Sequence, residues 1–338
     1  MAEGTSGAQG CRRPKLNTLV DQWNAYLDRL PWHKGELDEA SYRAFLRAGS
    51  LGVQPQSAAS VVAERIKAAG ERIKPRKIER QLLRAYRYAA GSTSIATSVP
   101  ENRPLHTWPD PDHNLIKEIV SDGLALFDLW ENSPVRFDDG QPHTEDFIDA
   151  LFPGSPLLCV GQSKYRFVTA ERESFRGRLC DLQFIVSSPM TALLGHTKEG
   201  RESSHTLENT GPRRFLVVEC DFEEFDSSGK ETEWAPLIRE WRTQGISVAD
   251  ACAAILNYLA HRGPLVMVVD SGGKSLHGWF YCAGVPDNVL RRFMNCAHRL
   301  GADKTTWLNR SQFVRMPDGT RSNRNRQSVY YFNPELIK

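Results

Sequence analysis

Residues 215–222 read Phe-Leu-Val-Val-Glu-Cys-Asp-Phe, an apolar run that ends in two acids separated by one position. An apolar run of this length predicts a buried β-strand. Because successive side chains of a strand point to opposite faces, Glu219 and Asp221 are expected to share one face at its end. Paired carboxylates there would supply the oxygen ligands that Mg²⁺ and Mn²⁺ prefer. The alternative is that the two acids only begin a surface loop.

A glycine turn joins two further predicted strands at residues 264–270 and 276–283. It presents Lys274, Ser275 and His277, which can donate hydrogen bonds to a phosphate that approaches the glycine backbone closely. The Gly-Lys-Ser triplet is not a P-loop, because a P-loop requires glycine at the position of Val268 and a helix after the triplet. The alternative for His277 is a structural histidine within a hairpin.

A third group of polar residues follows a predicted helix at residues 287–300. Asp303 comes just after this helix, and Arg310 and Arg315 flank a short predicted strand at residues 312–316. The whole chain has a formal net charge of only +2, so the basic stretch 299–326 is a local signal. An acid beside arginines is either a surface ion pair or a metal ligand next to phosphate-binding groups.

Together these three features resemble the archaeo-eukaryotic primase superfamily over residues 214–332. That family combines an acid-x-acid pair at a strand end, a Ser-x-His motif in a later hairpin, an Asp after the next helix, and a strand that carries Arg. The matching positions are Glu219-Cys-Asp221, Ser275-Leu-His277, Asp303 and Arg315. The chain departs from the family in carrying Glu219 where the first acid is commonly Asp. Asp270 and Asp318 compete with Asp303 for the place of third ligand.

The resemblance implies an RRM-like catalytic core and a DNA primase or primase-polymerase. Such an enzyme makes or extends primers on single-stranded DNA from NTPs or dNTPs, with two Mg²⁺ or Mn²⁺ ions in the site. The residues that the resemblance assigns are, for metal binding and catalysis, Glu219, Asp221 and Asp303; for nucleotide binding, Lys274, Ser275, His277 and Arg315; and for DNA contact, Arg310, Arg321, Arg324 and Arg326.

Strands interleaved with helices predict an α+β fold in which helices pack on a mixed β-sheet. Residues 14–91 predict a small all-helical accessory domain after a disordered tail at residues 1–13. A Ser/Thr/Pro-rich linker is expected at residues 92–113, and the catalytic domain at residues 114–338. Within that domain the remaining patterns predict helices at 114–130, 144–151, 234–244 and 248–261, and strands at 157–168, 182–186 and 327–332.

Composition narrows the setting in which the protein is expected to act. The chain shows neither a signal-peptide pattern nor a run of about 18 apolar residues, so we expect no membrane partner. Its seven cysteines form no CxxC pair, which favours a cytoplasmic protein and gives no support to zinc at Cys159 and Cys180. Without a P-loop the chain is expected to work with a separate replicative helicase.

Three other functions remain open at this level. A repair or damage-tolerance polymerase would use the same residues without starting chains. A non-catalytic replication initiator or DNA-binding module could keep the fold, although clustered carboxylates disfavour it. A hydrolase built on Ser275 and His277 is disfavoured because the two residues lie on one strand and the chain has no Gly-x-Ser-x-Gly elbow.

Overall fold

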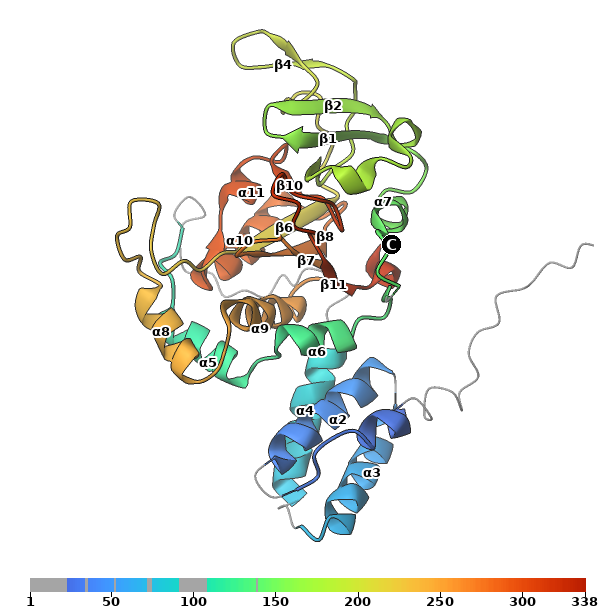
Figure 1. Ribbon diagram of the computed structural model, residues 1–338, viewed down its shortest axis with the longest axis vertical. Helices are drawn as coiled ribbons and strands as arrows, with labels where there is room; N and C mark the ends of the chain where they lie inside the picture. Colours follow the sequence, from blue (N-terminus) through green and yellow to red (C-terminus); the bar gives the residue numbers. More distant parts are fainter. Residues whose placement is uncertain (1–22, 34–35, 52, 72–74, 91–107, 138) are drawn as a thin grey trace, which may run out of the picture. The chain divides into compact units, whose positions relative to one another are not determined.

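The computed structural model describes residues 23–33, 36–51, 53–71, 75–90, 108–137 and 139–338 (Figure 1). The chain divides into two compact units, Met1–Ala90 and Gly91–Lys338, and each is described by itself. The tail expected at residues 1–13 and most of the linker expected at residues 92–113 lie outside the described residues.

The first unit is built from helices. They are α2 (Leu37–Ser50), α3 (Pro55–Ala68) and α4 (Pro75–Ala90). The indole of Trp23 is buried and donates a hydrogen bond to the Ala44 carbonyl at 3.0 Å. The Tyr86 hydroxyl of α4 donates to the Val53 carbonyl at 2.6 Å, which ties the last helix to the segment before α3.

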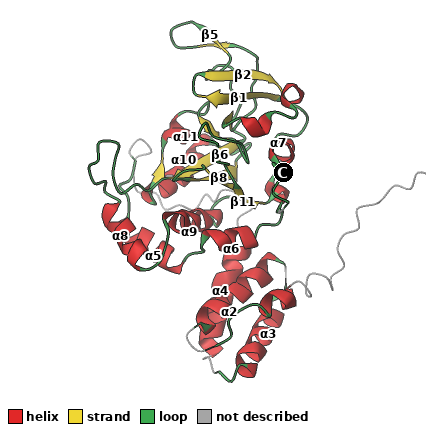
Figure 2. Cartoon of the chain, viewed as in Figure 1, coloured by secondary structure: helices red, strands yellow, loops and turns green. Residues whose placement is uncertain are grey.

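The second unit combines helices and strands, and Figure 2 shows how they alternate along the chain. Its helices are α5 (His113–Asp122), α6 (Leu126–Glu131), α7 (Thr144–Leu151), α8 (Ala235–Thr243), α9 (Val248–Ala260), α10 (Asp287–Arg299) and α11 (Thr305–Leu308). Its strands are β1 (Leu157–Ser163), β2 (Arg166–Glu171), β3 (Phe184–Val186), β4 (Gly195–His196), β5 (Glu202–Ser203), β6 (Phe215–Cys220), β7 (Leu265–Asp270), β8 (Leu276–Tyr281), β9 (Ala302–Asp303), β10 (Phe313–Arg315) and β11 (Val329–Phe332).

The strands form separate antiparallel sheets. The larger sheet has the order β11-β7-β8-β6-β9, a second sheet has the order β10-β3-β1-β2, and β4 pairs with β5. The predicted α+β class is confirmed, but the single mixed sheet is wrong: each strand pair of the described residues is antiparallel. The crossover through α8 and α9 leaves β6 parallel to β7, but the tight turn after β7 inserts β8 between them.

The larger sheet contains a split β-α-β arrangement. Along the chain its members run β6-α9-β7-β8-α10-β9, and in space the strands lie in the order β9-β6-β8-β7. Helices α9 and α10 cover one face. A Cβ at Gly278 of β8 would lie 2.6 Å from the Leu256 side chain of α9, so only glycine admits this close approach.

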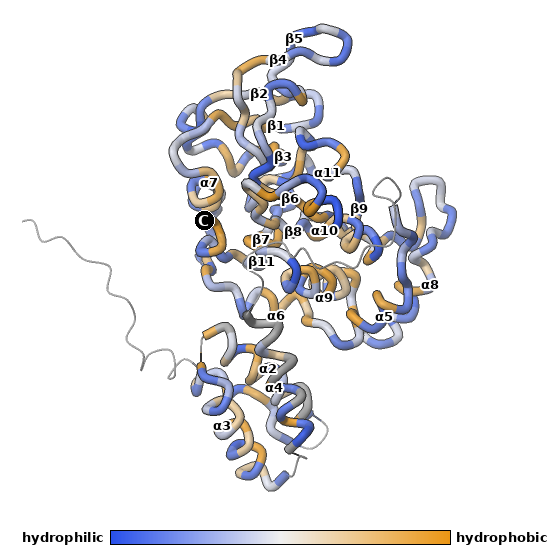
Figure 3. The backbone as a smooth tube through the Cα atoms, turned by 180° about the vertical axis from the view of Figure 1, so that it is seen from behind, coloured by the Kyte–Doolittle hydropathy of each residue, from blue (hydrophilic) through white to orange (hydrophobic). Residues whose placement is uncertain are grey.

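Helix α9 is almost entirely buried, and Figure 3 shows it as hydrophobic along most of its length. The ring of Phe280 in β8 meets that of Phe293 in α10 at a centroid distance of 4.9 Å. A helix that is apolar on nearly all sides must be covered on nearly all sides. Helices α5 and α6 contact the side of α9 that the sheet leaves open.

The opposite face of the larger sheet forms a core with the second sheet. Val217 of β6 and Trp279 of β8 belong to one buried cluster with Val160, Ile185 and Val314 of the second sheet. The same face becomes polar toward the end of β6. The sequence of β6, apolar first and acidic last, therefore places its charges where the core between the two sheets ends.

Two predicted elements are divided in the structure. The helix expected at 114–130 is two helices, α5 and α6, because the backbone of Gly123 is extended and ends α5. A Cβ at Gly123 would lie 2.2 Å from the Ala254 Cβ of α9, so the close approach of α9 requires glycine here. The strand expected at 157–168 is a hairpin of β1 and β2, whose turn is held by the Ser163 hydroxyl accepting from the Tyr165 and Arg166 amides. This turn contains neither glycine nor proline.

Among the residues that the structure describes, no helix is both long enough and apolar enough to cross a membrane.

Candidate active site

Strand pairing brings the three predicted motifs onto one face of the larger sheet. Glu219 of β6 lies opposite His277 of β8 on one side and opposite Asp303 of β9 on the other. Directly opposed residues share a face. Ser275 lies two positions before His277, and Asp221 two positions after Glu219, so both continue the same face. This is the face that α9 and α10 leave free.

Glu219 is held by the Ser-x-His motif. Its Oε1 lies 3.3 Å from His277 Nε2 and accepts a hydrogen bond from the Ser275 hydroxyl at 3.3 Å. Burial opposes ionisation of this carboxyl, but His277, Ser275 and the charge of Arg315 outweigh burial and lower its pKa to about 2. Glu219 is therefore a carboxylate at neutral pH with its charge compensated.

Asp221 has the opposite environment. Its Oδ1 is buried and has no hydrogen-bond partner. Burial raises the pKa of Asp221, and repulsion from Glu223 and Glu219 raises it further. A carboxylate with an unpaired oxygen and two acidic neighbours is stabilised by any cation that reaches it.

Glu223 is a member of this face that the sequence analysis missed. It forms an ion pair with Lys274 at 2.8 Å, which raises the pKa of the lysine. The signal was available, because Glu219, Asp221 and Glu223 alternate at the spacing of a strand face. Lys274 belongs to the glycine turn and is mostly exposed, so its ion pair with Glu223 lies at the surface.

Asp303 lies beside Glu219 in register but is turned toward its own chain. Its Oδ1 accepts from the Thr305 amide at 2.9 Å and from the Thr305 hydroxyl at 2.7 Å. The next residue, Thr306, is buried and donates from its hydroxyl to the Val217 carbonyl at 2.6 Å. Helix α11 is therefore anchored on β6, which fixes the backbone of Asp303 close to the two acids.

The two rivals of Asp303 have other contacts. Asp270 is paired with Leu276, one position out of phase with the His277 pair, so its side chain belongs to the other face. It accepts from the Gly272 amide at 2.7 Å and so holds the turn. Asp318 is buried, and its two oxygens are bound by Arg326 at 2.5 and 2.7 Å. Of the three candidates for third ligand, Asp303 is thus the one that shares the face of Glu219.

Arg315 brings positive charge toward Glu219, and Arg321 brings it to the glycine turn. Arg315 of β10 is half-buried, and burial together with the charge of Arg321 lowers its pKa, while Glu219 opposes that change. Arg321 donates to the Ser271 carbonyl at 3.4 Å. A Cβ at Gly273 would lie 2.4 Å from Arg321 Nη1, so this glycine makes room for the guanidinium.

The remaining predicted DNA-contacting arginines lie elsewhere. Arg310 donates to the Leu207 carbonyl at 3.2 Å, in the loop that follows β5. Arg326 pairs with Asp318 and also donates to the Gly140 and Gln141 carbonyls. Arg324 is exposed, with a φ of 68°. Of these four arginine side chains, that of Arg321 is the one that contacts the glycine turn.

The donors of this face fit a divalent cation in part. The described residues contain no group of three or more His, Cys, Asp or Glu side chains already arranged to hold a metal. The orphaned, buried oxygen of Asp221 beside the ionised Glu219 is nevertheless the donor set that hard cations prefer. Thr305 occupies the Oδ1 of Asp303, so Oδ2 is the oxygen through which Asp303 could join them.

Comparison of the chain with models of known protein families, with characterised proteins and with solved structures found no match.

Proposed function

We propose that this protein is a DNA-templated nucleotidyltransferase, a DNA primase or primase-polymerase of the archaeo-eukaryotic type. The observation that carries the proposal is the shared face of Glu219, His277 and Asp303, three residues from separate motifs that the strand register sets side by side. The split β-α-β order supports an RRM-like core for this face.

Glu219, Asp221 and Asp303 are the proposed ligands of Mg²⁺ or Mn²⁺. A divalent ion bound there supplies positive charge that stabilises the phosphoryl oxygens and promotes attack by a hydroxyl. Glu219 is ionised and oriented by His277 and Ser275. Asp221 carries the carboxylate that gains most from a cation, because its Oδ1 has no partner within the protein.

Ser275, His277, Lys274 and Arg315 are the proposed binding groups for the triphosphate of the incoming nucleotide. Lys274 and Ser275 lie at the glycine turn, His277 follows in β8, and the hydroxyl, imidazole, ammonium and guanidinium groups of the four can donate to phosphate oxygens. Such donors stabilise the charge that passes to pyrophosphate as the 3′-hydroxyl forms its bond to the α-phosphate. Arg321 and Arg324 are the proposed contacts to the backbone of the single-stranded template, and a separate helicase is the proposed partner.

Primer synthesis on single-stranded DNA tests this proposal. The parent protein, Asp221→Asn and the exposed control Asp110→Asn are incubated with labelled nucleotides and Mg²⁺ or Mn²⁺, and the products are resolved by size. We expect short products from the parent and the control, and a loss of about 100-fold or more for Asp221→Asn, as for removal of a group that acts on the transferring phosphate.

The other outcomes separate the competing functions. Extension of a supplied primer without new chains would indicate a repair-type polymerase. Binding of single-stranded DNA by all three proteins without any synthesis would indicate a non-catalytic module and would overturn the proposal. Equal primer synthesis by the parent and Asp221→Asn would contradict the proposed catalytic role of the acidic residues.

A further inference from the structure

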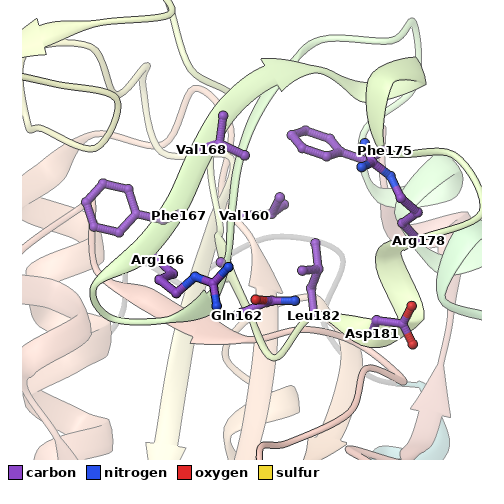
Figure 4. Close-up of a pocket in the computed structure, with 10 residues that line it drawn as sticks. Val160, Gln162, Arg166, Phe167, Val168, Phe175, Arg178, Asp181 and Leu182 are labelled. Atoms are coloured by element: carbon purple, nitrogen blue, oxygen red, sulfur yellow. The ribbon is translucent and has the colours of Figure 1, made fainter.

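The second sheet carries a pocket that has no part in the proposed active site. It has a volume of about 520 Å³ and lies between the β1-β2 hairpin and the segment 175–182. Figure 4 shows Arg166 and Gln162 on one side of it, Arg178 and Asp181 on the other, and Val160 and Leu182 between them. This volume lies in the range of sites for small organic ligands.

The two arginines of the pocket differ from their neighbours in the chain. Arg172 is buried and pairs with Glu145 and Asp149, and Arg176 pairs with Glu173. Arg166 and Arg178 are exposed, and no carboxylate of the described residues lies within 4.0 Å of either guanidinium. The Arg178 guanidinium donates a hydrogen bond to the Ser174 carbonyl, a neutral acceptor. Their positive charge is therefore available to an anion.

The floor of the pocket is apolar. Val160 and Phe175 are buried, whereas Val168 is 50% exposed although it lies on a strand. An exposed valine beside a buried phenylalanine leaves apolar surface for a flat ligand to cover. Gln162 and Asp181 at the rim can donate to and accept from polar edges of such a ligand.

We propose that this pocket binds a nucleotide, with the base on the apolar floor and the phosphate between Arg166 and Arg178. The choice of a nucleotide among anions with a flat body rests on the proposed function. A hydrogen bond also links the pocket to the loop that reaches the candidate active site. The Leu182 carbonyl, in the pocket wall, accepts from the amide of Thr320 at 3.2 Å, and the next residue is Arg321. The nucleotide can be free or the phosphorylated end of a strand.

Equilibrium binding without divalent cations tests the pocket. The ligands are ATP, a 5′-phosphorylated oligonucleotide and the same oligonucleotide with a 5′-hydroxyl. The proteins are the parent and two double variants. The pocket variant carries Arg166→Ala and Arg178→Ala. The control variant carries Lys198→Ala and Arg201→Ala, which remove the same charge from the exposed β4-β5 connection. We expect the pocket variant to bind a phosphorylated ligand at least about tenfold more weakly than the control, since each charge-assisted contact is lost.

The ligand that responds identifies the source of the nucleotide. Weaker binding of ATP indicates a free nucleotide, and weaker binding of the phosphorylated oligonucleotide alone indicates a strand end. Equal binding by the pocket variant and the control overturns the inference. Primer synthesis by the control variant tests the proposed function separately. If the pocket variant binds more weakly but the control makes no primers, the nucleotide pocket is supported and the proposed enzyme activity is rejected. If the control makes primers but both variants bind equally, the enzyme activity is supported and the nucleotide pocket is rejected.

Discussion

Two carboxylates separated by one residue have opposite electrostatic environments in this protein. Glu219 is compensated by His277 and Ser275, whereas Asp221 is buried among acids and keeps an unpaired oxygen. A fold that stabilises one charge and strains its neighbour gives up stability at that point. That strain gives a prediction that does not depend on an activity assay.

We expect Asp221→Asn to raise the free energy of unfolding by on the order of 1 kcal/mol at neutral pH, the scale typical of relieving a strained functional position. The pKa of Asp221 is raised in the folded state, so its charge costs stability above that pKa. The advantage of the variant should shrink as the pH falls toward 3.8, the ordinary aspartate value, because the parent carboxyl then becomes neutral. Urea denaturation at several pH values measures both effects, and a variant less stable than the parent at pH 7 would contradict them.

The same pair of proteins reports on the metal. A ligand that binds only the folded state raises its stability by mass action. We therefore expect Mn²⁺ to raise the melting temperature of the parent and to leave that of Asp221→Asn nearly unchanged. The exposed control Asp110→Asn should respond like the parent, and an equal rise in all three proteins would place the bound ion away from Asp221.

At the scale of elements, the 317–328 loop joins structural and candidate functional residues. Asp318 is 5% exposed and is held by Arg326, while Arg321 reaches the glycine turn after β7. The sequence alone groups Arg321, Arg324 and Arg326 as equivalent DNA contacts. Their contacts in the structure differ: of the three, Arg326 is the one that forms an ion pair with a buried carboxylate, that of Asp318.

We expect Arg326→Gln to destabilise the protein by about 3 kcal/mol, because it leaves Asp318 buried without its ion pair. Arg324→Gln, in the same loop, should change stability by less than about 0.5 kcal/mol. Urea denaturation of the two variants makes the comparison. If Arg326→Gln kept full stability and lost affinity for single-stranded DNA, its role would be strand contact and not support of the loop.

The elements around the site differ in how well the sequence predicts them. Strand β6 was predictable from a local signal, an apolar run that ends in alternating acids. The turn after β7 was predictable from another local signal, two consecutive glycines. Strand β9 was not, because Ala302 and Asp303 form a strand only by pairing with Cys220 and Glu219. Position 123, where α5 ends, must be glycine because α9 packs against it, and α9 is far from it in sequence.

The candidate site was predictable as a set of residues, and its geometry was not. Residue types and their order pointed to Glu219, Asp221, Ser275, His277 and Asp303. Their meeting on one face depends on β8 and β9 flanking β6, a strand order that follows from the crossovers through α9 and α10. Asp270 is excluded from the face of His277 by the same kind of information, because the register pairs Asp270 with Leu276 and Val269 with His277.

At the scale of the whole molecule, the proposed catalytic residues and the proposed nucleotide pocket all belong to the second unit, Gly91–Lys338. The buried cluster that supports the acidic face is likewise made of residues from this unit, including Val217 and Trp279. Unit 1 has its own interior, with Trp23 and Phe45 buried. Each unit therefore has buried residues of its own.

We expect the second unit alone, residues 91–338, to extend a supplied primer at a rate comparable with that of the full chain. Every proposed metal, nucleotide and strand contact remains in it, so the chemical step should not need the first unit. Primer extension by both proteins, with circular dichroism to show that the fragment is folded, makes the comparison. A folded fragment without extension would mean that the first unit takes part in catalysis or in holding the strand. A fragment that extends primers but no longer starts chains would assign initiation to the helical unit.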